Sequence, residues 1–226
     1  MGNQVNPMLQ LLRQRQEGRQ VGIPSYCTAN GLVIEAVLEQ AGRFSDSVLI
    51  EATSNQVNQF GGYTGMQPAD YRDYVWGIAD RVGFPRDRII LAGDHLGPQP
   101  FQQLPEAEAM PKACEMVRLY AAAGYTKIHL DTSMRLADDD PSAPLSDYTV
   151  ARRGAELLRV AGDAWAELKA RKPDAVHPVY IIGSEVPVPG GAQAKEEMQV
   201  TDPEAFAATV RAYKEVFAQH GLADKW

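Results

Sequence analysis

The chain has 226 residues, and 45% of them are hydrophobic, so it can bury a sizeable core as one large domain or two small ones. Its 22 Lys and Arg against 29 Asp and Glu give a net charge of -7, which argues against nucleic acid or an anionic membrane as the main partner. No run approaches the roughly 20 apolar residues of a membrane helix. The N-terminus does not have the pattern of a signal peptide, and we therefore expect a cytoplasmic protein.

Helical and strand patterns alternate along the chain. In chain order they predict a helix at 8–16, a strand at 21–25, a helix at 32–41, a strand at 48–51, a helix at 68–82, a strand at 88–92, a helix at 107–123, a strand at 127–130, a helix at 147–169, a strand at 179–182 and, after a capping box at 201–204, a helix that ends at Gly221. The strands are short continuous apolar runs, which are typical of a parallel sheet covered by helices. The predicted class is α/β, and no linker composition marks a domain boundary.

The two cysteines, Cys27 and Cys114, are far apart and form no CxxC motif. Neither a disulfide framework nor a thiolate zinc site is predicted from them. We expect both to be reduced and buried as small side chains, because free cysteine is among the most buried residue types.

Long polar segments follow four of the predicted strands, at 51–65, 94–105, 131–144 and 185–199. In an α/β barrel or a doubly wound sheet, ligands bind at this edge. Functional residues are therefore expected where the strands end. No GxGxxG or GxxxxGK[ST] motif is present, so a nucleotide site and a Walker-type kinase are not predicted.

After the third strand, Asp94 stands beside His95 between Gly93 and Gly97. Histidine suits a divalent transition metal, aspartate suits proton transfer, and glycine lets the backbone turn sharply and approach a ligand. The alternative is a turn in which Asp94 caps and His95 bonds to the backbone. A lone Asp-His pair leaves both interpretations open.

His129 and Asp131 alternate at the end of the fourth strand, so their side chains point to the same side of it. Glu51 and Glu185 each end another strand, although a solvated or capping carboxylate is the commoner role at such a position. The polar run that includes Asn55 and Gln56 can equally be a hydrated loop. Several strands that each end in a ligand or acid-base residue form a stronger indication than any one of them.

Four segments together resemble the Z-subunit family of class II tagatose-bisphosphate aldolases, which includes tagatose-6-phosphate 4-epimerases. They are LIEATSNQVNQFGGYTGM at 49–66, GDHLGP at 93–98, KIHLD at 127–131 and EVPVPGG at 185–191. The resemblance extends from about Val21 to the end of the chain and is more specific than any single motif.

This resemblance implies a TIM (β/α)8 barrel with a divalent metal, expected to be zinc, at its C-terminal face. Asp94 matches a proton-transferring aspartate, His95 the adjacent metal-ligand histidine, and Glu185 a glutamate that precedes a Gly-Gly pair and contacts the metal. We therefore assign Asp94 and Asp131 to catalysis, His95 and Glu185 to metal binding, and Glu51, Asn55, Gln56, His129, Gly190 and Gly191 to substrate binding.

The family is roughly twice as long as this chain, and a closed barrel has eight strands where five are predicted. We expect residues 1–226 to be a single TIM-barrel domain that holds the first five β/α units and is incomplete on its C-terminal side. The remaining metal-ligand histidines and the phosphate loops of the aldolases would then lie outside these residues.

Two functions follow from the resemblance. In the first, the metal polarises a ketose carbonyl and Asp94 moves the proton of the C4 hydroxyl, as in a tagatose-1,6-bisphosphate aldolase component or a tagatose-6-phosphate 4-epimerase. In the second, the chain is a non-catalytic subunit that stabilises a separate aldolase. The expected partners are a small sugar phosphate and either an aldolase catalytic subunit or a second copy of the chain.

Overall fold

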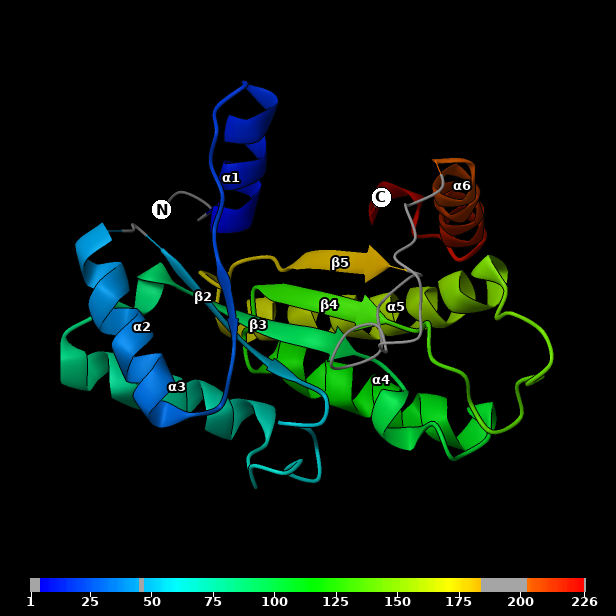
Figure 1. Cartoon of the computed structure of the whole chain (residues 1–226), viewed down its shortest axis with the longest axis horizontal. Helices are drawn as coiled ribbons and strands as arrows, with labels where there is room; N and C mark the ends of the chain where they lie inside the picture. The colour runs from blue at the N-terminus through cyan, green and yellow to red at the C-terminus, as the bar shows by residue number, and fades with distance from the viewer. Residues whose placement is uncertain (1–4, 45–46, 184–202, 226) are drawn as a thin grey trace, which may run out of the picture.

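The computed structural model describes residues 5–44, 47–183 and 203–225 (Figure 1). In this part of the chain, five parallel strands form one sheet in the order β1-β2-β3-β4-β5. The strands are β1 (Ser25–Cys27), β2 (Val48–Thr53), β3 (Ile89–Leu96), β4 (Lys127–Asp131) and β5 (Val179–Gly183). The helices are α1 (Pro7–Gln16), α2 (Gly31–Phe44), α3 (Pro68–Val82), α4 (Glu106–Ala122), α5 (Asp147–Arg171) and α6 (Pro203–Gln219), with short 3-10 turns at Arg86–Arg88, Gln99–Phe101 and Ala223–Lys225. The predicted α/β class is confirmed.

Two groups of predicted boundaries are wrong. The first strand begins at Ser25 instead of Val21, since Pro24 has no N–H for a ladder and the pairing with β2 starts at Ser25. The second and third strands continue to Thr53 and Leu96, so Asp94 and His95 belong to a paired strand and not to a turn. The capping box predicted at 201–204 falls partly outside the described residues.

The sheet has two unlike faces because side chains alternate along each strand. Helices α2, α3, α4 and α5 cover one face, where Ile50, Ala52, Ile128 and Leu130 join the main hydrophobic core. Figure 1 shows α1 on the opposite side of the sheet from α2, α3 and α4. On that side, which we call the inner face, Leu49, Ile90 and Ala92 form a small apolar cluster against Met8 of α1.

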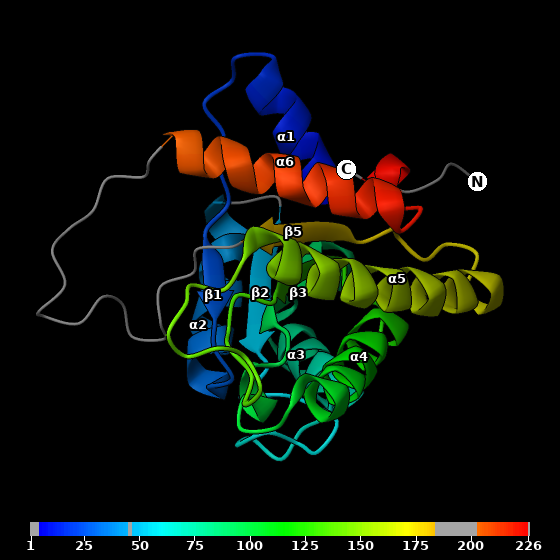
Figure 2. The ribbon, with the colours of Figure 1, turned by 90° about the vertical axis from the view of Figure 1, so that its right-hand side faces the viewer.

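Helix α6 packs beside α5, the last of the helices that cover the face opposite the inner one (Figure 2). In the second turn of α5, the fully buried Arg153 bonds to Glu106 at the start of α4 and to Asp139 in the β4–α5 loop. A buried guanidinium with carboxylate partners on both sides fixes the loop that leaves the carboxyl end of β4. None of the described helices is long and apolar enough to cross a membrane.

The start of α1 is tied to the amino ends of two strands by one buried side chain. Asn6 Nδ2 donates to the carbonyls of Thr126 and His177, both at 2.8 Å, and Asn6 Oδ1 accepts from the backbone N–H of Met8. Asn6 therefore caps its own helix and anchors that helix below β4 and β5. This edge of the sheet is opposite to the one where the strands end.

We expect Asn6→Ala to lower the free energy of unfolding by about 2–3 kcal/mol, because it removes a helix cap and two further part-buried hydrogen bonds, to the carbonyls of Thr126 and His177. Denaturant unfolding of the full-length protein measures the change. Ser142→Ala, which removes an exposed hydroxyl bonded to Asp140, is the matched control and should change stability by less than about 0.5 kcal/mol. Equal effects of the two variants would contradict the anchoring role.

Candidate functional site

A buried ion pair crosses the inner face of the sheet. Glu51 on β2 and Lys127 on β4 are both paired to Ala92 on the strand between them. The small side chain of Ala92 leaves room for the two long ones to meet above it, and Lys127 Nζ lies 2.6 Å from Glu51 Oε2. The second oxygen of Glu51 accepts a hydrogen bond from the Ser25 hydroxyl. Both carboxylate oxygens of Glu51, predicted as a substrate-binding residue, thus have partners inside the protein.

A β-bulge directs two consecutive residues of β3 to the inner face. Between two matched pairs of residues, β3 has Asp94 and His95 where β4 has only His129. In a regular strand the two side chains would point to opposite faces. Here both face inwards, His95 has a positive φ of 48°, and Leu96 returns to the helix-covered core.

Asp94 lies between three positively charged or hydrogen-bonding groups. Its Oδ1 is 3.0 Å from His129 Nδ1 and 3.6 Å from Lys127 Nζ, and its Oδ2 is 3.8 Å from His95 Nε2. Burial by itself would raise the pKa of Asp94, but the hydrogen bond with His129 and the charge of Lys127 lower it to about 2. Asp94 is therefore an ionised carboxylate at neutral pH.

The His95 ring is oriented by a buried carboxylate. His95 Nδ1 is 2.9 Å from Asp131 Oδ2, and Asp131 Oδ1 accepts from the backbone N–H and the hydroxyl of Ser133. Since Nδ1 is engaged, His95 Nε2 is the nitrogen that faces Asp94 and His129. A histidine held in this way by a carboxylate is typical of metal ligands.

Two glycines near the bulge are required by packing within the protein. A Cβ at Gly97 would overlap the backbone carbonyl of Asp131, and a Cβ at Gly93 would overlap Leu96 and touch Tyr120. The sequence suggested that these glycines allow close approach to a ligand. The contacts instead show that they bring β3 against β4 and the helix-covered core.

The remaining predicted residues are less central. Gln56 Oε1 accepts from the backbone N–H of Thr53 at 2.8 Å and lies 3.8 Å from Cys27 Sγ, at the margin of the cluster. Asn55 is exposed in the β2–α3 loop, where its carbonyl accepts from the N–H of Tyr63. Glu185, Gly190 and Gly191 lie outside the described residues.

The sequence interpretation missed Lys127 and misplaced Cys27. Lys127 has the same parity on its strand as His129, and this was the available signal. Cys27 was predicted to be buried, but it is exposed on edge strand β1, and its Sγ faces Glu51 and Asp94. Although the residue is exposed, its thiol is partly desolvated, and this desolvation together with the nearby carboxylates of Asp94 and Glu51 raises the pKa of Cys27 to about 12.

Two overlapping groups of metal-ligand type occur among the described residues. One contains Asp94, His95 and His129, the other contains Cys27, Glu51 and Asp94, and the ligand atoms within each group are within 4.8 Å of one another. Glu51, Asp94 and Asp131 carry three formal negative charges, against one positive charge on Lys127. A divalent cation would balance the remaining two, so the residues fit such an ion.

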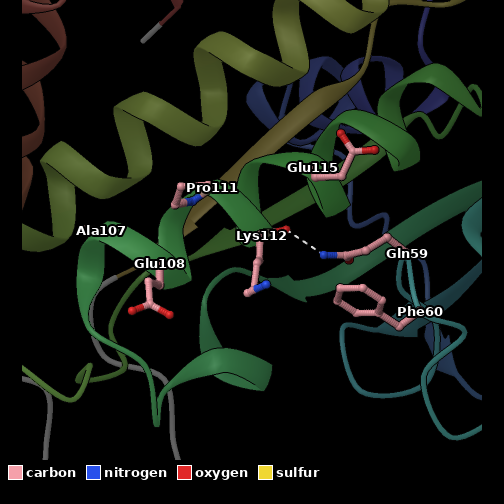
Figure 3. Close-up of a pocket in the computed structure, with 7 residues that line it drawn as sticks. All are labelled: Gln59, Phe60, Ala107, Glu108, Pro111, Lys112 and Glu115. Carbon is pink, nitrogen blue, oxygen red and sulfur yellow. Dashed lines mark hydrogen bonds between the residues drawn. The ribbon is translucent and has the colours of Figure 1, made fainter.

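A separate pocket of about 510 Å³ lies between the β2–α3 loop and α4 (Figure 3). In it, Gln59 Nε2 donates to the carbonyl of Lys112, and Lys112 Nζ lies 5.9 Å from the centre of the Phe60 ring. None of the residues of the inner-face cluster lines this pocket.

A family model described as D-tagatose-1,6-bisphosphate aldolase subunit GatZ/KbaZ-like matches residues 8–226. The chain belongs to this family. It is 49% identical over 218 residues to the D-tagatose-1,6-bisphosphate aldolase subunit GatZ of Salmonella heidelberg (strain SL476). This alignment covers 96% of this chain and 50% of that protein. It is also 49% identical over 216 residues to subunit GatZ of Salmonella newport (strain SL254), in an alignment that covers 95% of this chain and 49% of that protein.

Among solved structures, this GatZ/KbaZ-like chain is similar to a probable tagatose 6 phosphate kinase from Sinorhizobium meliloti 1021. The TM-score is 0.76 at 49% identity, and the match covers 91% of this chain and 46% of that one. The chain thus spans about half the length of the curated relatives that it matches. The family resemblance seen in the sequence is confirmed.

We expect His95→Ala to remove a bound divalent metal and His177→Ala to retain it. His177 precedes β5 at the opposite edge of the sheet, where its ring packs against Trp165 with centroids 4.4 Å apart. Elemental analysis of the dialysed full-length variants measures the metal content. Equal retention in both variants would overturn the assignment of His95 as a ligand.

Proposed function

We propose that the protein takes part in metal-dependent aldol chemistry on tagatose phosphates, as a tagatose-1,6-bisphosphate aldolase component or as a tagatose-6-phosphate 4-epimerase. Membership in the GatZ/KbaZ-like family supports the assignment to tagatose-bisphosphate aldolase systems. The observation that carries the catalytic proposal is the ionised Asp94 between His95, His129 and Lys127 on the inner face.

We propose that His95 and Glu185 hold the metal and that zinc is the ion. His129, predicted as a substrate-binding residue, lies in the same ligand group, and we propose that it shares this role. A divalent metal bound there would supply Lewis-acid polarisation of a ketose carbonyl. Asp131, predicted as catalytic, would act by holding His95 in place, since both of its oxygens already accept hydrogen bonds.

Asp94 would accept the proton of the C4 hydroxyl of the sugar. As the O–H bond breaks, its electron pair forms the C4 carbonyl, the C3–C4 bond breaks, and that pair passes to the C2–C3 fragment as an enediolate. Release of the aldehyde, followed by protonation of C3 of the enediolate while Asp94 gives up the proton it took, would complete an aldolase reaction. If the aldehyde rotates and is attacked again on its other face, Asp94 returns the proton and the product is the C4 epimer.

The remaining residues would bind the substrate. Glu51 would act through Lys127, while Gln56, Asn55, Gly190 and Gly191 are proposed as substrate contacts from the resemblance. Phosphoryl transfer is not proposed, because the chain has no Walker-type or dinucleotide loop.

The second candidate is a non-catalytic subunit of a separate aldolase. The word "subunit" in the names of the relatives favours it. The partner would then be a catalytic aldolase chain.

We also propose that residues 1–226 are the first five units of one TIM-barrel domain. The sequential order of the parallel strands supports this, because a doubly wound sheet reverses its strand order. The polar inner face, which a closed barrel would enclose, supports it as well. The relatives are long enough to supply the further units.

We therefore expect residues 1–226, produced alone, to self-associate or aggregate and to be inactive on tagatose phosphates. Among the described strands, β1 and β5 each have only one neighbour, and unpaired strand edges promote association. Light scattering after size-exclusion chromatography gives the oligomeric state. A monomer that unfolds cooperatively and is active would contradict the barrel proposal.

The functional test is an assay of the full-length protein without a partner, with zinc and either tagatose 1,6-bisphosphate or tagatose 6-phosphate. We expect aldol cleavage or C4 epimerisation, and a fall of about 10²-fold or more in Asp94→Asn, the usual effect of losing a general acid-base group. Asp224→Asn, at an exposed aspartate paired with Lys225, is the matched control and should keep full activity.

No turnover by the wild type, together with a rise in the stability of an added catalytic aldolase, would favour the subunit function instead. Turnover that Asp94→Asn leaves unchanged would refute the role of Asp94.

A further inference from the structure

The second ligand group lies beside the proposed catalytic one and shares Asp94 with it. Cys27 on β1 and Glu51 on β2 are directly paired residues, so their side chains leave the inner face next to each other. Cys27 Sγ, a carboxylate oxygen of Glu51 and a carboxylate oxygen of Asp94 all lie within 4.8 Å of one another. We propose that Cys27, Glu51 and Asp94 form a second cation site, selective for thiophilic divalent ions such as zinc and cadmium.

The donor set determines this selectivity. A thiolate is a soft ligand that favours zinc-type ions over magnesium and calcium, which prefer oxygen ligands alone. A carboxylate has two oxygens, so Asp94 can serve an ion on each side. Cys27 is exposed and is the last residue of β1, at the carboxyl edge of the sheet that a closed barrel leaves open to solvent. The other cysteine, Cys114, is half-buried and lies 3.6 Å from Glu156 of α5.

Binding requires that Cys27 lose its proton. The S–H bond breaks, its electron pair forms the sulfur–metal bond, and the proton passes to solvent. The ion replaces the proton as the positive partner of the two carboxylates that surround the sulfur.

Lys127 makes this site weaker than the first one. Its ammonium lies 2.6 Å from Glu51 and 3.6 Å from Asp94, so it already neutralises part of their charge and repels a second cation. One divalent ion balances the described cluster, and a second one leaves it positive. We therefore infer a low-affinity site that fills only when thiophilic metal is in excess.

Filling this site would inhibit the protein, because the second ion would draw Asp94 away from the C4 hydroxyl. This consequence rests on the proposed function. The binding of the ion itself does not, since it is measured at the sulfur.

Titration of the full-length protein with cadmium tests the site through the ultraviolet thiolate-to-cadmium charge-transfer absorption. We expect the absorption in the wild type and in Cys114→Ser, and its loss in Cys27→Ser. Glu51→Gln should weaken the binding about tenfold or more, because it removes a charged ligand, and Lys127→Met should strengthen it about tenfold or more, because it removes the competing charge. Circular dichroism confirms that each variant is folded.

Three results would overturn the proposal: no absorption in the wild type, an absorption that persists in Cys27→Ser, or binding that Glu51→Gln leaves unchanged, which would indicate a lone thiol. Excess zinc should inhibit turnover in the wild type, and it should inhibit turnover in Cys27→Ser less strongly. If the cadmium absorption behaves as expected while zinc does not inhibit, the cation site stands and the proposed role of Asp94 in turnover is refuted.

Discussion

One extra residue in β3 determines how the inner face is arranged. The bulge places Asp94 and His95 side by side opposite His129, although consecutive strand residues normally point to opposite faces. The positive φ of His95 belongs to this distortion. The close approach of Gly97 to the end of β4 holds the distorted segment against its neighbour and brings Asp131 within reach of His95.

The charged residues beside the bulge are buried as a connected set. Lys127 and Glu51 have side chains that are only 11% and 6% exposed, and isolated charges at such positions would be strongly destabilising. Ser25 donates a hydrogen bond to Glu51, Asp94 lies 3.6 Å from the Lys127 ammonium, and His129 is hydrogen-bonded in turn to Asp94. Removal of Lys127 would leave the Glu51 carboxylate buried without its charged partner, and breaking a buried pair in this way costs about 3–5 kcal/mol. The same network keeps Asp94 ionised, so stability and the proposed chemistry rest on the same contacts.

The two faces of the sheet differ in what they contribute to stability and to the proposed chemistry. The helix-covered face is apolar and supplies most of the core, whereas the inner face carries the ionisable groups near the carboxyl ends of the strands. Asp94 occupies the point where the two ligand groups meet. A cation bound by one group therefore changes the electrostatic potential at the other group. The ammonium of Lys127, close to Glu51 and Asp94, weakens cation binding at the group that contains Cys27.

The sequence by itself determined the α/β class, the approximate place of the described α-helices and of strands β2 to β5, and the choice of Glu51, Asp94, His95, His129 and Asp131 as members of one cluster. These are local properties, because apolar periodicity and strand-end position can be seen along the chain. Only the tertiary structure determined the bulge, the pairing of His95 with Asp131, and the presence of Lys127 and Cys27 in the cluster. These depend on register between strands that are far apart in sequence, and a shift of one residue reverses the face to which a side chain points.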